Sequence, residues 1–471
     1  MSLPKCVLML YGLCYHPEPR QAKMHHDMHG LPISAASSGA AAAFDRTMAG
    51  YLKYRADLAT RLGETLAADA DFGLAHCLKG YFALLSYKQA NVPMAVEAAR
   101  AARRLTANAT PREQAHVAAL EAWIGGDLDR ALGVWEQILS VHPLDVIAFR
   151  LAHFNNFWLG RPGEMRASVE RVKPKWAHDL PGYGTVLSCH CFSLEECGDY
   201  AGAEPSGRAA IAIDPGDLWG THAVAHIMEM QGRHAEGIAW LDELERHWEG
   251  GNNLLHHLWW HRALFHLDRR EFDAVLDLYD KRFRNFASPL TQAQPDLYID
   301  VQNAASMLYR LELAGIDAGN RWREIADKAE GRIGVCLSAF TLPHWMMALA
   351  ASGRDDAARR MLEAMRAFAS GEGTLQRIVR IAAIPVCEAV LAHRRGDHAR
   401  AVALMRPALG EMYQLGGSHA QQDVLMQLFL DSAVKADCAD DVRLILSAAK
   451  RAGFELNERL GYAQAVRQFA H

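Results

Sequence analysis

The sequence predicts an all-α protein made of antiparallel helix pairs that stack one after another. Apolar residues recur at positions i, i+3, i+4 and i+7 along Ala- and Leu-rich stretches, which is the spacing of an amphipathic helix. Alternating β-branched runs are few, and Asn-Gly and Asp-Gly hairpin turns are absent from the sequence. A glycine followed by Asp or Arg recurs at steps of 34, 38 and 34 residues, at Gly126, Gly160, Gly198 and Gly232.

The residues around each of these turns have a physical role in a helix pair. Glycine allows the tight reversal between two antiparallel helices. Five residues later, in four copies, a small residue lets the second helix pack closely on the first. These small residues are Ala131, Ala203, Gly237 and Ala274. Pro143 and Pro215 each open a Pro-x-Asp turn, which ends one pair and begins the next.

The period near 34 with this punctuation resembles tetratricopeptide repeats. The clearest copy runs from His116 through Asp145, Arg269-Arg270 continues the series, and Gly353 and Gly396 resume it. Such repeats stack into a right-handed superhelix, because one helix pair cannot bury its apolar face alone. We therefore expect an irregular segment over residues 1–30 and a single solenoid over 31–471, with an irregular stretch near 285–340 that contains Pro289 and Pro295.

Several phrases resemble one particular group, the tetratricopeptide repeat protein 38 family. They include HGLPIS (residues 29–34), REQAHVAALEAW (112–123), THAVAHIMEM (221–230), HHLWWHRAL (256–264) and LGGSHAQQDVLMQLFL (415–430). The likeness spans roughly residues 27–435 and recurs in order. It implies a mainly cytoplasmic, all-helical repeat protein. The family carries no settled activity, so the resemblance implies a fold and not a reaction.

Composition excludes several classes of protein. Half of the 471 residues are hydrophobic and 22% are charged, which is ordinary for a globular chain. The net charge of -5 argues against a general nucleic-acid binder, and apolar runs stay shorter than the roughly 18 residues of a membrane span. Nine scattered cysteines favour a reducing, cytoplasmic compartment. The apolar stretch Cys6–Tyr15 imitates a secretory signal, but it has a single flanking lysine and lacks an A-x-A cleavage site.

The concave wall of the predicted solenoid is rich in histidine and aromatic residues. In repeats of this type the first helix of each pair lines that wall, at offsets -10, -6 and -3 from the turn. These offsets select Arg150, Phe154 and Phe157; Ser188, Phe192 and Glu195; His222, His226 and Glu229; His116, Leu120 and Trp123; and Trp259, Ala263 and His266. The wall therefore resembles a small-molecule site more than a flat peptide groove. We expect ligand contacts from His116, Trp123, Phe154, Phe157, Phe192, Glu195, Trp259 and His266.

Five residues on that wall could carry chemistry. His222 and His226 stand at i and i+4, a spacing that suits a tetrahedral divalent metal ion, and Glu229 adds a carboxylate suited to proton transfer. His257 and His261 form a second such pair one repeat later. The other interpretation is that these are hydrogen-bonded polar residues of a helical interior, since the pair lacks the H-E-x-x-H signature.

The sequence thus favours a helical-repeat protein that binds a small molecule or a peptide in its concave channel, without nucleic-acid or membrane partners. The alternative is a hydrolytic or acid–base enzyme, with or without a metal ion, that uses His222, His226, Glu229, His257 and His261. The chain lacks a P-loop, G-x-G-x-x-G, G-x-S-x-G and C-x-x-C, so it lacks the signatures of common nucleotide, hydrolase and thioredoxin chemistries.

Two further clusters are weaker candidates. Cys189-His190-Cys191 with Cys197 could hold zinc, but a structural site normally needs paired C-x2-C units, so core packing is the preferred interpretation. The tract from His25 to His29 could bind a metal ion, and we expect instead a partly ordered segment near the chain start.

Overall fold

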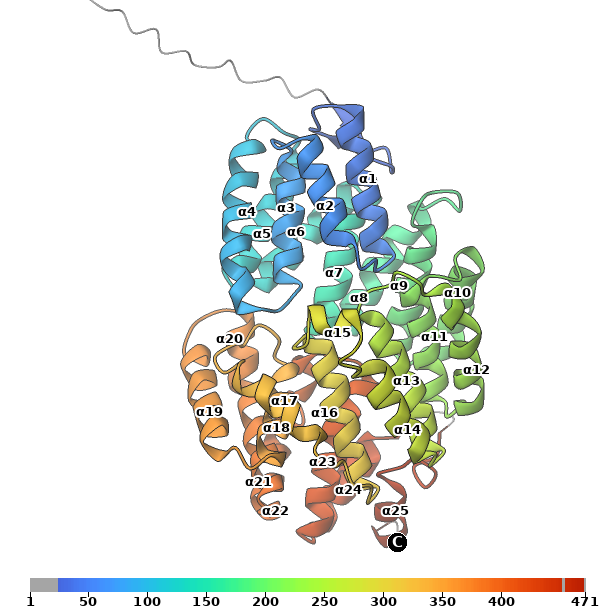
Figure 1. Cartoon of the computed structure of the whole chain (residues 1–471), viewed down its shortest axis with the longest axis vertical. Coiled ribbons are helices and arrows are strands. Elements are labelled where there is room, and N and C mark those ends of the chain that lie inside the picture. Colours follow the sequence, from blue (N-terminus) through green and yellow to red (C-terminus); the bar gives the residue numbers. More distant parts are fainter. Residues whose placement is uncertain (1–23, 451–453, 470–471) are drawn as a thin grey trace, which may run out of the picture.

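The computed structural model describes residues 24–450 and 454–469, and this part of the chain is helical almost throughout (Figure 1). The predicted fold class is confirmed: the chain is all-α, and antiparallel helix pairs stack in sequence order into a right-handed superhelix. The strands of the described residues are two short ones, β1 (His25–His26) and β2 (Pro32–Ile33), which pair antiparallel.

The first helices of the pairs form the interior. Most are buried on nearly all sides, and every residue of α11 is buried. These first helices are α1 (Ser38–Leu52), α3 (Gly73–Leu84), α5 (Pro111–Ile124), α7 (Val146–Trp158), α9 (Tyr183–Glu196), α11 (Leu218–Met230), α13 (Leu254–Asp268), α16 (Tyr298–Leu313), α18 (Thr341–Ala351), α21 (Ile384–Arg394) and α23 (His419–Lys435).

The second helices form the outer layer and bury one stripe each. In α4, for example, the buried residues are alanines spaced three or four apart. The second helices are α2 (Leu58–Ala68), α4 (Val92–Leu105), α6 (Leu128–Val141), α8 (Pro162–Val172), α10 (Tyr200–Ile213), α12 (His234–Leu244), α14 (Phe272–Leu278), α17 (Arg321–Glu330), α19 (Asp355–Ala369), α22 (His398–Ala408) and α24 (Ala439–Ala448).

Shorter elements connect the pairs. The region 285–340, where the repeat rhythm breaks, holds the five-residue α15 (Pro289–Ala293) followed by α16 and α17. The remaining elements are α20 (Thr374–Ile378), α25 (Ala463–Phe469), the 3-10 turns η1 (Gln89–Asn91), η2 (Lys173–Lys175), η3 (Glu245–His247) and η6 (Met412–Leu415), and the π-helical turns η4 (Tyr279–Phe283) and η5 (Val379–Ala383). None of the described helices is both long enough and apolar enough to cross a bilayer.

The turn residues that mark the repeat in the sequence are the residues that cap the helices. Gly126 has φ +81°, a left-handed conformation that favours glycine, and the Asp127 side chain then accepts a hydrogen bond from the backbone N–H of Arg130 in α6. The aspartates of the two Pro-x-Asp turns cap first helices in the same way. Asp145 accepts from the Ala148 N–H at 2.9 Å, and Asp217 accepts from the Gly220 N–H at 3.0 Å.

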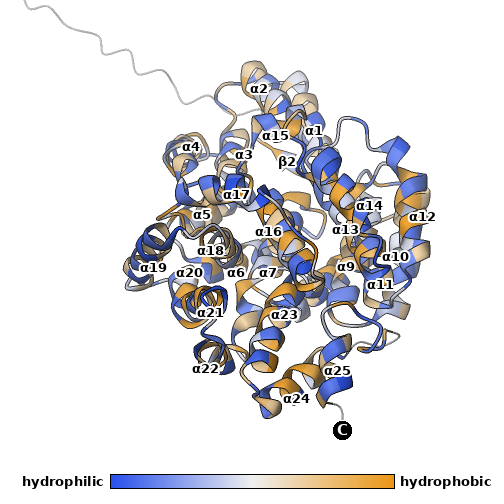
Figure 2. Cartoon of the chain, turned by 60° about the horizontal axis from the view of Figure 1, so that its bottom comes forward, coloured by the Kyte–Doolittle hydropathy of each residue, from blue (hydrophilic) through white to orange (hydrophobic). Residues whose placement is uncertain are grey.

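Contacts between helix pairs that are far apart in sequence close the superhelix. The Thr374 hydroxyl donates to the carboxylate of Asp129, 245 residues earlier, at 2.9 Å. On the other side the backbone N–H of Asn252 donates to the Tyr54 carbonyl at 2.7 Å, which joins the N-terminal pairs to the start of α13. Figure 2 shows α16 near the centre and second helices such as α4, α12, α19 and α24 at the periphery. Inner helices such as α16 and α23 thus pack against other first helices inside the superhelix.

We expect the closing contacts to contribute measurably to stability. Gly160 and Gly353 have nearly the same left-handed φ, +66° and +65°. A methyl group at Gly160 would lie 2.0 Å from the Tyr413 carbonyl oxygen, whereas one at Gly353 would meet nothing within 4 Å. Gly353→Ala should therefore lower the free energy of unfolding, measured with urea, by about 1–2 kcal/mol through backbone strain. Gly160→Ala should lower it by clearly more. Equal losses would show that the contact between residues 160 and 413 does not support the closed form.

Candidate functional site

The interior contains a cluster of four imidazoles contributed by two neighbouring first helices. His222 and His226 lie on α11, His257 and His261 lie on α13, and all four side chains are buried. One ring nitrogen from each lies within 4.8 Å of the other three. The ring centroids of His226 and His261 are 4.4 Å apart, and those of His222 and His257 are 4.9 Å apart. Side chains that are distant in sequence thus meet because i, i+4 pairs on adjacent helices face each other.

The cluster has an outer shell of hydrogen bonds. His222 and His226 contact each other through their Nε2 atoms at 2.9 Å. His261 contacts Glu229 Oε2 through Nδ1 at 2.7 Å, and His257 contacts Asn303 Oδ1, on α16, through Nδ1 at 2.8 Å. Because a carboxylate can only accept, the His261 Nδ1 carries a proton in that contact.

Burial controls the charge of these imidazoles. Desolvation lowers the pKa of His222 and of His226 well below the usual value, and the neighbouring imidazoles lower both further. The pKa of His257 falls for the same reasons, and burial together with the Arg310 charge lowers the pKa of His261 to about 3. All four are therefore neutral at pH 7. A general acid or base works best with a pKa near the operating pH, so these values give the acid–base enzyme alternative no support.

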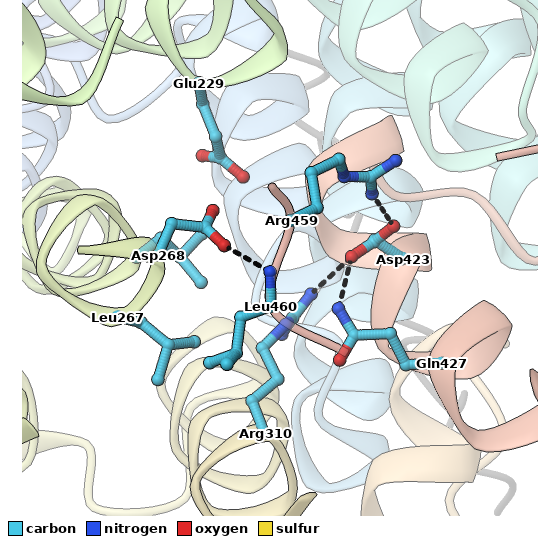
Figure 3. Close-up of a pocket in the computed structure, with 9 residues that line it drawn as sticks. Glu229, Leu267, Asp268, Arg310, Asp423, Gln427, Arg459 and Leu460 are labelled. Carbon is cyan, nitrogen blue, oxygen red and sulfur yellow. Dashed lines mark hydrogen bonds and ion pairs between the residues drawn. The ribbon is translucent and has the colours of Figure 1, made fainter. Parts of the chain in front are cut away.

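A small polar pocket lies on the far side of Glu229 (Figure 3). Its volume is about 20 Å³, and Arg310, Asp423, Arg459 and Asp268 surround it. Arg459 donates to Asp423 at 2.6 Å, and the Arg310 guanidinium lies 3.9 Å from the same carboxylate. Burial raises the pKa of Asp268, whose carboxylate accepts the backbone N–H of Leu460. This space accommodates one water molecule and not an organic ligand.

A much larger cavity adjoins the imidazole cluster on the opposite side. Its volume is about 630 Å³, and His222 and His257 form part of its wall. Its other walls come from the N-terminal pairs, from α7 and from the start of α16. They include the aromatic residues Tyr51, Tyr54, Phe82, Phe154, Phe157, Trp158, Trp219 and Tyr298. The charged residues that line it are Arg55, Lys79 and Arg150, and among the described residues the lining includes no Asp or Glu.

Arg150 is the buried cation of this cavity. It is 1% exposed, and its guanidinium donates to the Cys189 thiol at 2.9 Å and to the Tyr54 hydroxyl. It also lies 5.4 Å from the centre of the Tyr54 ring and 5.6 Å from that of Trp219. All of these partners are uncharged groups. Within the described part of the chain Arg150 forms no ion pair, which is unusual for a buried guanidinium.

The sequence-predicted residues divide between the cavity, the cluster and other places. Phe154 and Phe157 line the cavity with His222 and His257. Phe192 packs against both His222 and His226 at 5.4 Å, and Glu195 Oε2 lies 3.9 Å from His226 Nδ1.

Four predicted ligand contacts lie away from the cavity and the imidazole cluster. His116 contacts the Asp145 carboxylate at 3.0 Å, and Trp123 packs on Trp135. Trp259 lies under Arg282, and His266 contacts Glu271 near the next turn. The cavity lining therefore includes none of these four residues.

The offset rule does not select the two histidines of α13, because they lie at other distances from the following turn than those of α11. His222 and His226 stand 10 and 6 residues before the left-handed Gly232, whereas His257 and His261 stand 13 and 9 residues before the left-handed Arg270. The helix α13 also begins earlier relative to its turn, so that His257 and His261 face α11 from positions the rule does not select. The rule does select Arg150, whose lack of a charged partner becomes visible only in the structure.

The two weaker clusters show no sign of metal binding. Cys189 contacts Arg150, Cys191 is buried, Cys197 is exposed, and His190 contacts Ser206 at 2.8 Å. In the N-terminal tract, His25 and His26 belong to β1, and the buried His29 contacts the Pro181 carbonyl at 2.8 Å. Among the described residues, the groups able to hold a metal ion involve neither the cysteines nor this tract.

No family model matches the chain, so the resemblance to the tetratricopeptide repeat protein 38 family stays a prediction. Among solved structures, the crystal structure of the yeast Tom70 is similar at 13% sequence identity, over 92% of this chain and 95% of that one, with a TM-score of 0.35.

The depressed pKa values predict loss of stability in acid. The unfolded chain binds a proton at each of these imidazoles below pH 6.5, whereas the folded state does not, so acidification favours unfolding. Each such imidazole should lower the free energy of unfolding by about 2 kcal/mol when the pH falls from 6.5 to 5. Nearby His153, also buried with a pKa far below its usual value, allows a clean test. In chelator-treated buffer, His153→Phe should lower the number of protons taken up on unfolding, given by the slope of unfolding free energy against pH, by about one. The same proton uptake in the variant and in the wild type would contradict the argument.

Proposed function

We propose that the protein binds a small organic acid, with an apolar body and a carboxylate, in the 630 Å³ cavity. Cavities of this size are typical of small-molecule sites, which combine apolar walls with a few polar groups. The aromatic walls suit the body of such a ligand. This proposal is narrower than the peptide or partner binding that helical repeats often perform, and the filling of the concave space by inner helices favours it.

The observation that carries the proposal is the charge of the lining. Arg150 is buried and forms no ion pair among the described residues, although its charge acts on the buried carboxylate of Asp217 at longer range. Arg55 and Lys79 line the same cavity, and its lining includes no acidic side chain of the described residues. A buried charge without a counter-charge is costly, and a ligand carboxylate would supply that counter-charge. The planar guanidinium also presents two donors to a carboxylate in a fixed geometry.

The position of Arg150 favours a ligand that enters with its acid group first. Arg150 is fully buried on α7, whereas Phe154 and Phe157 follow it on the same face of that helix at i+4 and i+7. The carboxylate would therefore meet Arg150, and the apolar body would lie along the two phenylalanines. The Tyr54 hydroxyl accepts a hydrogen bond from the Arg150 guanidinium.

A matched pair of ligands tests the charge requirement. 2-Naphthylacetate and its neutral analogue 2-naphthylethanol differ mainly in the acid group, and calorimetry gives the dissociation constant of each. The wild-type protein should bind the acid about 10- to 100-fold more tightly than the alcohol, because a hydrogen bond to a charged group is worth about 1.5–3 kcal/mol. In Arg150→Met this preference should disappear, and in Arg150→Lys a part of it should remain. Equal preference in the wild type and in Arg150→Met would contradict the proposal.

A further inference from the structure

We propose that His222, His226, His257 and His261 together bind one divalent transition-metal ion, with Zn²⁺ as the ion that fits best. This inference does not rest on the organic ligand, because it is argued from the four imidazoles and their outer hydrogen bonds and from no contact of Arg150. It extends the metal expectation from one histidine pair to a complete four-ligand site.

The four ring nitrogens are close enough together to reach one ion. Four nitrogen ligands at 2.0–2.1 Å from Zn²⁺ are about 3.3 Å from one another. The four ring nitrogens here lie within 4.8 Å of one another, and those of His222 and His226 are already at 2.9 Å. Small rotations of the imidazoles therefore suffice to bring all four onto one ion. The two helices need not move, since each provides an i, i+4 pair whose spacing is fixed by the helix.

The hydrogen bonds of the outer shell prepare the ligand atoms. Glu229 accepts from His261 Nδ1, which leaves the His261 Nε2 lone pair for a metal ion. That Nε2 atom is buried and, within the described part of the chain, has no hydrogen-bond partner. Asn303 holds His257 through its Nδ1 atom in a similar way. Metal-binding histidines in proteins almost always have such a second partner.

Hydrogen bonding alone leaves the other two imidazoles unsatisfied. In the contact between the Nε2 atoms of His222 and His226 one ring donates and the other accepts, and the Nδ1 atoms of both rings are buried without a hydrogen-bond partner in the described chain. A metal ion would instead use both Nε2 lone pairs and leave a proton on each Nδ1. The Nδ1 atom of His226 would then face Glu195, whose Oε2 lies 3.9 Å away.

Charge balance also fits a divalent ion. Four neutral imidazoles leave a bound ion with its charge of +2, which is costly in a dry interior unless anions lie nearby. Buried carboxylates lie beside the cluster, with Glu229 next to His261 and with Glu195 and Glu196 next to His226. They place negative charge close to a bound cation. The Arg310 guanidinium lies by the Asp423 carboxylate on the far side of Glu229.

The ligand type selects among ions. Imidazole suits Zn²⁺, Cu²⁺ and Ni²⁺, whereas Mg²⁺ and Ca²⁺ prefer oxygen ligands. Four protein nitrogens around one ion match the tetrahedral coordination that Zn²⁺ prefers, whereas Cu²⁺ and Ni²⁺ prefer square-planar sites. An ion could reach the site through the 630 Å³ cavity, because His222 and His257 form part of its wall.

Zinc titration of the metal-free full-length protein tests this site. The protein is treated with a chelator, dialysed, and titrated with Zn²⁺ alone in a calorimeter, and metal analysis after dialysis gives the retained amount. We expect one equivalent with a dissociation constant in the micromolar range or tighter. His226→Gln and His261→Gln should each weaken binding at least 100-fold. The matched control is His153→Gln, which removes a buried imidazole that lies outside the cluster and should bind as the wild type does.

Cobalt substitution provides a second readout if a variant fails to fold. The wild-type protein loaded with Co²⁺ alone should show the intense visible absorption of a tetrahedral ion, and one equivalent of Zn²⁺ should remove it. Weak octahedral absorption, less than half an equivalent of retained zinc, or equal losses in His153→Gln and His226→Gln would overturn the proposal. Those results would identify the cluster as a purely hydrogen-bonded part of the core.

Discussion

The enclosure of the first helices is the constraint on which the rest of the structure depends. In an open solenoid one face of each first helix meets solvent, whereas here inner helices from later pairs fill the concave space. Every residue of α11 is consequently buried. A polar side chain on such a helix must find a partner inside the protein. The imidazoles of α11 and α13 meet for this reason, and the same enclosure keeps them uncharged.

Enclosure also separates two interior regions of opposite charge. The charged residues in the mainly apolar wall of the large cavity are cations, of which Arg150 is the most buried, whereas the carboxylates of Glu195, Glu196 and Glu229 lie beside the imidazole cluster. His222 and His257 stand between the two regions and belong to both. An anion in the cavity and a cation in the cluster would therefore lie close together, each on the side where the protein supplies the opposite charge. This arrangement is what distinguishes the interior from an ordinary apolar core.

Local signals in the sequence predicted the helix pairs. The closing contacts and the meeting of the two histidine pairs depend on long-range contacts, which the sequence does not reveal. The Gly126-Asp127 pair and the Pro-x-Asp turns mark helix ends because glycine φ and aspartate capping are local properties. The contacts that close the superhelix, such as the one between Thr374 and Asp129 at a separation of 245 positions, leave no periodic trace in the sequence. The i, i+4 spacing of His222 and His226 was visible, but their meeting with His257 and His261 depends on the register of α13. That register differs from the one in α11, because His257 and His261 stand 13 and 9 residues before the left-handed residue at 270, whereas His222 and His226 stand 10 and 6 residues before Gly232.

The most direct test of the central claim is a crystal structure of the zinc-loaded protein with diffraction data recorded on both sides of the zinc absorption edge. The account predicts one strong anomalous peak inside the protein, about 2.0–2.1 Å from a ring nitrogen of each of the four histidines. A map with zinc only at surface residues, or with the four imidazoles turned away from one another, would contradict it.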